Sequence, residues 1–121
     1  MSVLDASAVL AWAQGEPGSD VVERVLLDGA VCGAANWSEV AQKVRAAGKD
    51  WLLVKALLES YRLGVEPVTA GDAERAAQRW HAGSGLSLAD RLCLALADRR
   101  EDTAWTADLA WGNGSRVRQI R

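Results

Sequence analysis

The sequence contains 121 residues, of which 50% are hydrophobic, and its formal net charge is −2. This length suits one domain with a buried core, and the hydrophobic content excludes a disordered chain. A slightly negative charge argues against a general nucleic-acid binder. No apolar run approaches the roughly 20 residues of a membrane span, and the first residues lack the basic region of a signal peptide. We therefore expect a cytoplasmic protein that does not enter a membrane.

Short apolar and β-branched runs alternate along the chain with segments of helical periodicity. The runs predict strands over 2–4, 30–34, 65–68, 103–107 and 116–120. Between them, apolar residues at helical spacing predict helices over 6–14, 19–29, 36–49, 50–64, 71–83 and 86–100. Strands that alternate with helices form a mainly parallel sheet covered on both faces. We predict a single α/β domain over residues 1–121, a three-layer sandwich with four or five short strands flanked by helices.

Four acidic residues occupy the same kind of position in this pattern. Asp5 ends the first strand, and Asp108 follows the fourth. Glu39 and Asp90 lie near the starts of the helices over 36–49 and 86–100. The ends of parallel strands and the helices that follow them meet at one edge of the sheet, where α/β proteins bind ligands. We therefore expect the four carboxylates to converge there.

Each acid taken alone also has a structural explanation. Asp5 and Asp108 can cap the turn or helix that follows them. The pairs Asn36/Glu39 and Ser87/Asp90 both match the spacing of a capping box.

Taken together, the acids indicate a metal site. Two carboxylates about 4 Å apart repel by about 4 kcal/mol at an effective dielectric constant of about 20. A helix N-terminus offsets only about 0.3–1 kcal/mol of that repulsion, whereas a divalent cation offsets far more. Ligands that are all oxygen suit magnesium or manganese. We predict Mg²⁺ or Mn²⁺ at this edge.

Four segments resemble, in order, the motifs of PIN-domain ribonucleases, and most closely those of the VapC-type toxins of bacterial toxin–antitoxin pairs. They are VLDASAVLAW (3–12), NWSEVAQ (36–42), LSLADRLCLALA (86–97) and TADLAW (106–111). The resemblance implies a PIN-like fold and catalytic, metal-binding roles for Asp5, Glu39, Asp90 and Asp108. It also implies that the hydroxyls of Ser7 and Thr106 support the acids, and we add Asn36 as a further supporting residue.

In that family the metal activates a water that cuts an RNA phosphodiester bond, leaving a 5′-phosphate. We therefore expect a metal-dependent endoribonuclease whose substrate is structured RNA, such as a tRNA, with an exposed loop. The resemblance also implies a small cognate antitoxin that blocks the acidic cleft with part of its own chain.

The helix over 50–64 carries more apolar surface than a one-sided helix needs. One face of this helix can pack against the core of the protein, which leaves the other face for a partner. We predict that Trp51, Val54, Leu58 and Tyr61 contribute to an interface, in a homodimer or with the antitoxin. A deeply buried helix is the alternative.

Two other kinds of protein also place acids at strand ends, but each requires an aspartate that this chain lacks. An aspartate-based phosphatase of the dehalogenase type requires a second aspartate two residues after the first, where this chain has Ser7. A receiver domain requires an acceptor aspartate at the end of the third strand, and VEPV (65–68) offers none. A non-catalytic PIN-like module that binds partners stays an open alternative.

Overall fold

The computed structural model describes residues 1–121 and contains one five-stranded sheet. The strand order is β3-β2-β1-β4-β5, and all neighbouring strands run parallel. The strands are β1 (Ser2–Leu4), β2 (Ala30–Gly33), β3 (Gly64–Glu66), β4 (Thr103–Thr106) and β5 (Val117–Gln119). The predicted α/β sandwich with a short parallel sheet is confirmed.

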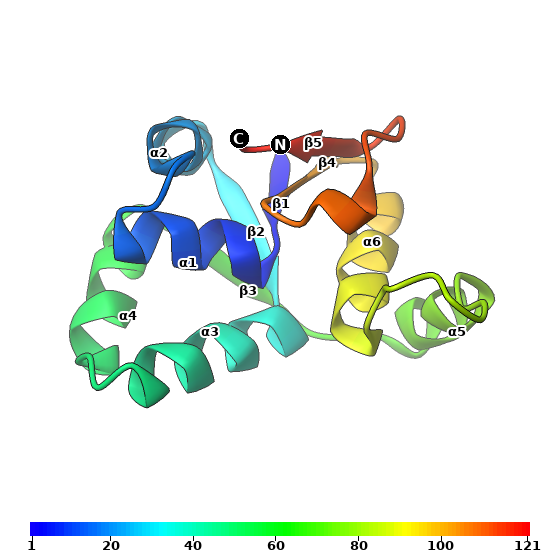
Figure 1. Cartoon of the computed structure of the whole chain (residues 1–121), viewed down its shortest axis with the longest axis horizontal. Helices are drawn as coiled ribbons and strands as arrows, with labels where there is room; N and C mark the ends of the chain where they lie inside the picture. Colours follow the sequence, from blue (N-terminus) through cyan, green and yellow to red (C-terminus); the bar gives the residue numbers. More distant parts are fainter.

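Helices cover both faces of the sheet (Figure 1). One side carries α1 (Ala6–Gln14), α2 (Ser19–Asp28), α3 (Ala34–Ala46) and α4 (Trp51–Ser60). The other side carries α5 (Ala70–Gln78), α6 (Leu88–Arg100) and the short 3₁₀ helix η1 (Leu109–Trp111). None of these helices combines the length and the apolar character that crossing a bilayer requires.

Alternate residues of the strands supply two hydrophobic clusters, one on each face. Leu4 and Cys32 point into the larger cluster, which α1 to α4 complete. Val3, Val31 and Ala104 point the other way, into the cluster that α6 and η1 complete. This alternation follows from the two-residue period of a strand and explains why the consecutive residues Val3 and Leu4 of β1 are both apolar.

The start of α3 differs from the sequence prediction. The helix begins at Ala34 directly after β2, and its N-cap is Gly33, which makes no side-chain cap. Asn36 therefore lies inside the helix, where it is buried, and the predicted Asn36/Glu39 capping box is wrong. The reason is that the extended backbone of Gly33 passes from strand into helix without a loop.

The inward face of α4 also differs from the prediction. Trp51 and Leu58 are buried in the larger cluster, and Val54 and Tyr61 pack against it. Positions 51, 54, 58 and 61 share one face of a helix, and this stripe faces the core rather than a partner. The exposed apolar side chains of α4 are Leu52, Leu53 and Leu57.

Candidate active site

Asp5 lies where β1 ends and α1 begins, at the carboxyl edge of the sheet. Its backbone N–H donates to the carbonyl oxygen of Trp105, which holds the end of β1 beside β4 (3.1 Å). Its carboxylate caps α1, because Oδ1 accepts the backbone N–H of Ala8 at 2.8 Å. The residue is only 3% exposed. The expected N-cap role of Asp5 is thus confirmed, and it leaves a carboxylate in the interior.

Two hydroxyls hold the Asp5 carboxylate. Ser7 Oγ donates to Oδ1 at 2.8 Å, and Thr106 Oγ1 donates to Oδ2 at 2.6 Å. Both hydroxyl oxygens also accept backbone N–H groups, from Ala107 at 2.9 Å and from Asp108 at 3.0 Å. The two residues singled out as supporting the acids therefore join Asp5 to the chain that follows β4.

Burial raises the pKa of Asp5 to about 6, because the charged carboxylate loses its contact with water. Hydrogen bonds from Thr106, Ala8 and Ser7 lower the pKa by less than burial raises it. The negative charge of Asp90 raises it further. No lysine or arginine forms an ion pair with Asp5, Asp90 or Asp108. The negative charge at this edge is therefore not balanced by the protein itself.

Asp90 lies in the first turn of α6, where the predicted capping box is confirmed. Ser87 Oγ accepts the N–H of Asp90 at 3.1 Å, and Asp90 Oδ2 accepts the N–H of Ser87 at 2.9 Å. Oδ1 of Asp90 has no hydrogen-bond partner among the protein groups, and the residue is partly exposed. A local cap thus fixes Asp90 and still leaves one oxygen for a ligand.

Asp108 has the same arrangement at the N-terminus of η1. Its Oδ1 accepts the N–H of Ala110 at 2.9 Å, which confirms the predicted turn cap. Gln119 of β5 donates to its backbone oxygen at 3.0 Å and anchors the turn to the sheet. Oδ2 of Asp108 is without a protein partner. Asp5, Asp90 and Asp108 are therefore all held by backbone caps rather than by cations.

Glu39 is not joined to the other acids by any hydrogen bond. Its carboxylate pairs with Lys43 one turn further along α3, at 2.9 Å. No group of three or more His, Cys, Asp or Glu side chains is close enough to enclose a metal ion. The predicted convergence of the four carboxylates into one cluster is therefore not seen in this structure, where Lys43 holds Glu39 and a local backbone cap holds each of the three aspartates.

The chemistry of the remaining donors fits Mg²⁺ or Mn²⁺. Asp5, Asp90 and Asp108 offer only oxygen, and no protein cation balances them. Both buried thiols lie outside this donor set, since Cys32 and Cys93 are in the hydrophobic clusters. A hard divalent cation prefers oxygen donors of this kind.

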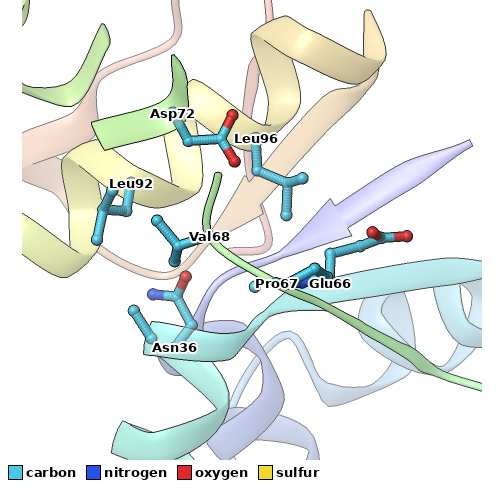
Figure 2. A pocket seen from close by; sticks show the side chains of 9 residues that line it. Asn36, Glu66, Pro67, Val68, Asp72, Leu92 and Leu96 are labelled. Carbon is cyan, nitrogen blue, oxygen red and sulfur yellow. The ribbon is translucent and has the colours of Figure 1, made fainter. Parts of the chain in front are cut away.

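Asn36 lies at a small cavity between α3, α6 and the segment after β3. Figure 2 shows its amide directed from α3 toward Val68 and Leu92. The cavity has a volume of about 10 Å³, room for about one water molecule. Oδ1 of Asn36 is buried without a hydrogen-bond partner. Asn36 therefore lines a packing junction and makes no hydrogen bond to the Asp5 carboxylate, which Ser7, Ala8 and Thr106 hold.

Asp72 is a second buried acid, and its position in the sequence pattern did not mark it as one. It is 4% exposed at the start of α5 and accepts two hydrogen bonds from Arg99 of α6, from Nε at 2.9 Å and Nη2 at 3.2 Å. Thr69 and Asp72 form a capping box. Burial raises the pKa of Asp72, but hydrogen bonds from Arg99 and Thr69 outweigh burial, so its pKa lies below the ordinary value. The spacing of Thr69 and Asp72 in the sequence is that of a capping box, whereas no sequence signal links Asp72 to Arg99, 27 residues away.

Comparison with protein families gives one clear match. The family described as PIN domain matches residues 2–113. No curated protein sequence matches this chain. The resemblance to PIN-domain proteins is therefore confirmed over nearly the whole chain.

Solved structures show the same fold at low sequence identity. A toxin–antitoxin complex from Klebsiella pneumoniae contains a chain that is 16% identical, with a TM-score of 0.79 and coverage of 100% of this chain and 98% of that one. The Mycobacterium tuberculosis toxin VapC20, described as cleaving the sarcin–ricin loop, is 17% identical, with a TM-score of 0.71 and coverage of 89% and 90%. DNA-bound VapBC from Salmonella typhimurium is 16% identical, with a TM-score of 0.70 and coverage of 99% and 98%.

Proposed function

Because this chain belongs to the PIN-domain family, we propose that it is a metal-dependent endoribonuclease and the toxin of a toxin–antitoxin pair. The observation that carries the proposal is the buried carboxylate of Asp5. Its pKa is raised and no protein cation accompanies it, while Asp90 and Asp108 lie at the same edge. Acids with a strongly perturbed pKa and no ion-pair partner in the protein are typical of functional sites. The likeness to a toxin described as cleaving the sarcin–ricin loop supports RNA as the substrate.

In this proposal Asp5, Asp90 and Asp108 hold Mg²⁺ or Mn²⁺ at the carboxyl edge of the sheet. The bound ion supplies an activated water near neutral pH and stabilises negative charge on the phosphate. Ser7 and Thr106 orient the Asp5 carboxylate through their hydroxyl protons. At pH 7 Asp5 is mostly ionised, since its pKa is about 6. The two hydroxyl donors hold the Asp5 carboxylate in one orientation, so that it would need little rearrangement to bind the cation.

Glu39 is the fourth proposed acid, although Lys43 holds it in this structure. Lys43 is one turn away, and the pair is largely exposed, so breaking it costs about 1 kcal/mol or less. Replacing Lys43 with glutamine should therefore leave cleavage intact if Glu39 acts as a ligand. A large loss of activity in that variant would assign the function to Lys43 instead.

We propose a cognate antitoxin as the protein partner and a homodimer as the assembly. The described complexes from Klebsiella pneumoniae and Salmonella typhimurium support an antitoxin. Leu52, Leu53 and Leu57 of α4 offer exposed apolar surface for one of these contacts. Replacing Leu53 with glutamate should weaken the contact and leave folding intact. Sedimentation of the chain alone and with its antitoxin measures both assemblies.

Cleavage of defined RNAs tests the proposed activity. The purified chain is incubated with tRNA, ribosomal RNA and messenger RNA in Mg²⁺, in Mn²⁺ and in EDTA. We expect cleavage of structured RNA at an exposed loop, with a 5′-phosphate on the product, and none in EDTA. The Asp5→Asn variant should be inactive, whereas Asp72→Asn is the matched control because Arg99 pairs with Asp72. Intact RNA under all metal conditions would contradict the proposal.

The second candidate function is a PIN-like module that binds partners without catalysis. The pairing of Glu39 with Lys43 favours it, as does the lack of any three acids close enough to enclose a metal ion. Antitoxin binding without any cleavage would establish this alternative. The phosphatase alternative gains no support, because the side chain beside Asp5 is the hydroxyl of Ser7 and not a second carboxylate.

A further inference from the structure

A groove with a volume of about 220 Å³ runs between α6 and the chain that links η1 to β5. Its floor is apolar and includes Leu94, Trp111 and Val117, all of the second hydrophobic cluster. Its rim carries Arg79 from the end of α5 and Arg116 from the start of β5. The groove therefore combines an apolar floor with a charged rim, and the proposed catalytic acids do not line it.

The rim has more positive than negative charge. Asp98 of α6 is the one carboxylate that lines the groove, and three arginines approach it. Arg79 Nη2 lies 2.8 Å from Oδ2 and makes a hydrogen bond. Arg75 Nη1 and Arg116 Nε lie 3.8 Å from the carboxylate oxygens, beyond hydrogen-bond distance. The lining itself holds two arginines and one carboxylate, an excess of one positive charge, and Arg75 adds a further positive charge beside it. This excess suits a phosphate.

The floor presents the ring of Trp111 rather than its polar N–H. Trp111 lines the groove and is 8% exposed, whereas its indole Nε1 is buried without a hydrogen bond. A ligand in the groove therefore meets the ring together with Leu94 and Val117, and does not reach the N–H. Aromatic and apolar side chains of this kind fit the face of a nucleobase better than they fit a charged side chain.

The groove begins next to the proposed catalytic acids. Leu94 follows Asp90 by four residues, about 6 Å along the axis of α6. Trp111 ends η1, the turn that Asp108 caps. Asp98 and the arginines lie further along, since Asp98 follows Asp90 by eight residues, about 12 Å along the same axis. An RNA strand cut at the acids therefore reaches the arginines some distance along the strand from the cut.

We propose that this groove binds one unpaired nucleotide of the RNA some distance along the strand from the cleaved bond, a subsite that rests on the proposed ribonuclease function. Its phosphate lies between Arg79 and Arg116, and its base lies on Leu94, Trp111 and Val117. Unpaired bases are accessible in loops and single strands, whereas paired bases are not. The subsite thus selects RNA that is unpaired at this position.

Binding to a labelled single-stranded RNA in EDTA tests the phosphate contacts without cleavage. Fluorescence anisotropy gives the binding constant at several salt concentrations. Each phosphate contact with single-stranded RNA contributes about 0.7 to the slope of log K against log salt concentration. We expect a slope less steep by about 0.7 for Arg116→Gln and by about 1.4 for the double variant Arg79→Gln/Arg116→Gln. Thermal melts establish that the variants fold.

Arg24→Gln is the matched control, because it removes one exposed arginine from α2 on the other side of the sheet (Figure 1). Its slope should equal that of the parent. Equal slopes for parent and Arg116→Gln would overturn the subsite. Binding of a poly-glutamate peptide in the groove without binding of RNA would also overturn the subsite, because the occupant would then be an acidic protein segment.

The indole N–H signals in a ¹H–¹⁵N NMR spectrum test whether the base occupies the floor. The chain has six tryptophans, and Trp111→Phe identifies the signal of Trp111. This signal should shift on titration with single-stranded RNA and stay in place with a duplex of equal length. A stationary signal during binding would overturn the position of the base. RNA cleavage by the parent protein in Mg²⁺ is measured separately. If the parent binds RNA in the groove but does not cleave it, the proposed ribonuclease function is refuted and the binding of RNA in the groove is not.

Discussion

Two regions of this protein bury a carboxylate at a helix start, and they treat its charge in opposite ways. Asp5 is 3% exposed and Asp72 is 4% exposed, and both accept backbone N–H groups as caps. Arg99 accompanies Asp72, whose pKa lies below the ordinary value. Only hydroxyl and backbone donors accompany Asp5, whose pKa rises to about 6. Burial alone therefore does not distinguish the two, whereas the presence of a cation does.

The difference is the one expected between a structural acid, Asp72, and the functional acid that we propose, Asp5. The Asp72–Arg99 pair ties α5 to α6 and has no charge left for a ligand. At Asp5, repulsion from Asp90 adds to the cost of burial, and the fold tolerates this cost in the absence of any compensating cation. A cost of this kind is typical of sites where activity and stability are in conflict. Four substitutions test this comparison.

The largest expected effect is the loss of RNA cleavage in Asp5→Asn. Asparagine keeps the cap but removes the charge that holds the cation. Loss of a group that only supports a metal ligand costs about 10–100-fold in activity, so loss of the ligand itself should cost more. Cleavage rates in Mg²⁺ measure the effect, compared with Asp72→Asn at a temperature where both variants are folded. Similar rates for parent and Asp5→Asn would remove Asp5 from the site.

The same substitution should make the metal-free protein more stable. A pKa raised from 3.8 to about 6 means that the folded protein binds the proton more tightly than the unfolded chain does. The penalty is absent below the ordinary pKa, grows as the pH rises from 3.8 to about 6, and is constant above that range. A shift of about two pKa units corresponds to about 3 kcal/mol, an upper value for the gain in Asp5→Asn at pH 7.

Urea unfolding in EDTA at pH 4 and at pH 7 measures this gain for the parent and Asp5→Asn. The difference between the two proteins should be small at pH 4 and largest at pH 7. A variant less stable than the parent at pH 7 would mean that the ionised Asp5 stabilises the fold, and the comparison with Asp72 would then fail.

Asp72→Asn should have the opposite sign. Its lowered pKa stabilises the folded protein above pH 3.8, and this stabilisation is lost as the pH falls through its folded pKa. Because Arg99 is partly exposed, we expect a loss of about 1–2 kcal/mol rather than the value of a fully buried pair. Urea unfolding at pH 7 measures the loss, and Arg99→Gln should give a similar one. Unchanged stability in both variants would show that the pair contributes nothing.

The sequence predicted the parts of this architecture that depend on local pattern. Apolar runs identify all five strands, and their alternation with helices brings Asp5 and Asp108 to one edge. The caps at Ser87 and Asp108 were also local signals. These features could be predicted because each depends on residues within one turn or one strand.

The remaining features depend on packing between distant segments. Helix α4 carries apolar side chains on both of its faces, so periodicity alone did not show that the face with Trp51 and Leu58 packs into the core. The arginine that pairs with Asp72 is 27 residues away in the sequence, at a spacing that carries no signal. Glu39 and Lys43 are spaced for an ion pair, which competes with a metal for the same carboxylate.

The smallest expected effect on stability belongs to Asp90→Asn, which sharpens the comparison between two identical caps. Asp90 and Asp72 both occupy the third position of a capping box, after Ser87 and Thr69. Only Asp72 has an arginine partner, and Asp90 is partly exposed. An asparagine oxygen can still accept the backbone N–H, so the unfolding free energy of Asp90→Asn should stay within about 0.5 kcal/mol of the parent. Cleavage, in contrast, should be lost, since one proposed ligand is gone. Urea unfolding and RNA cleavage on the same preparation separate the two roles: a loss of stability like that of Asp72→Asn, with cleavage retained, would make Asp90 a structural cap only.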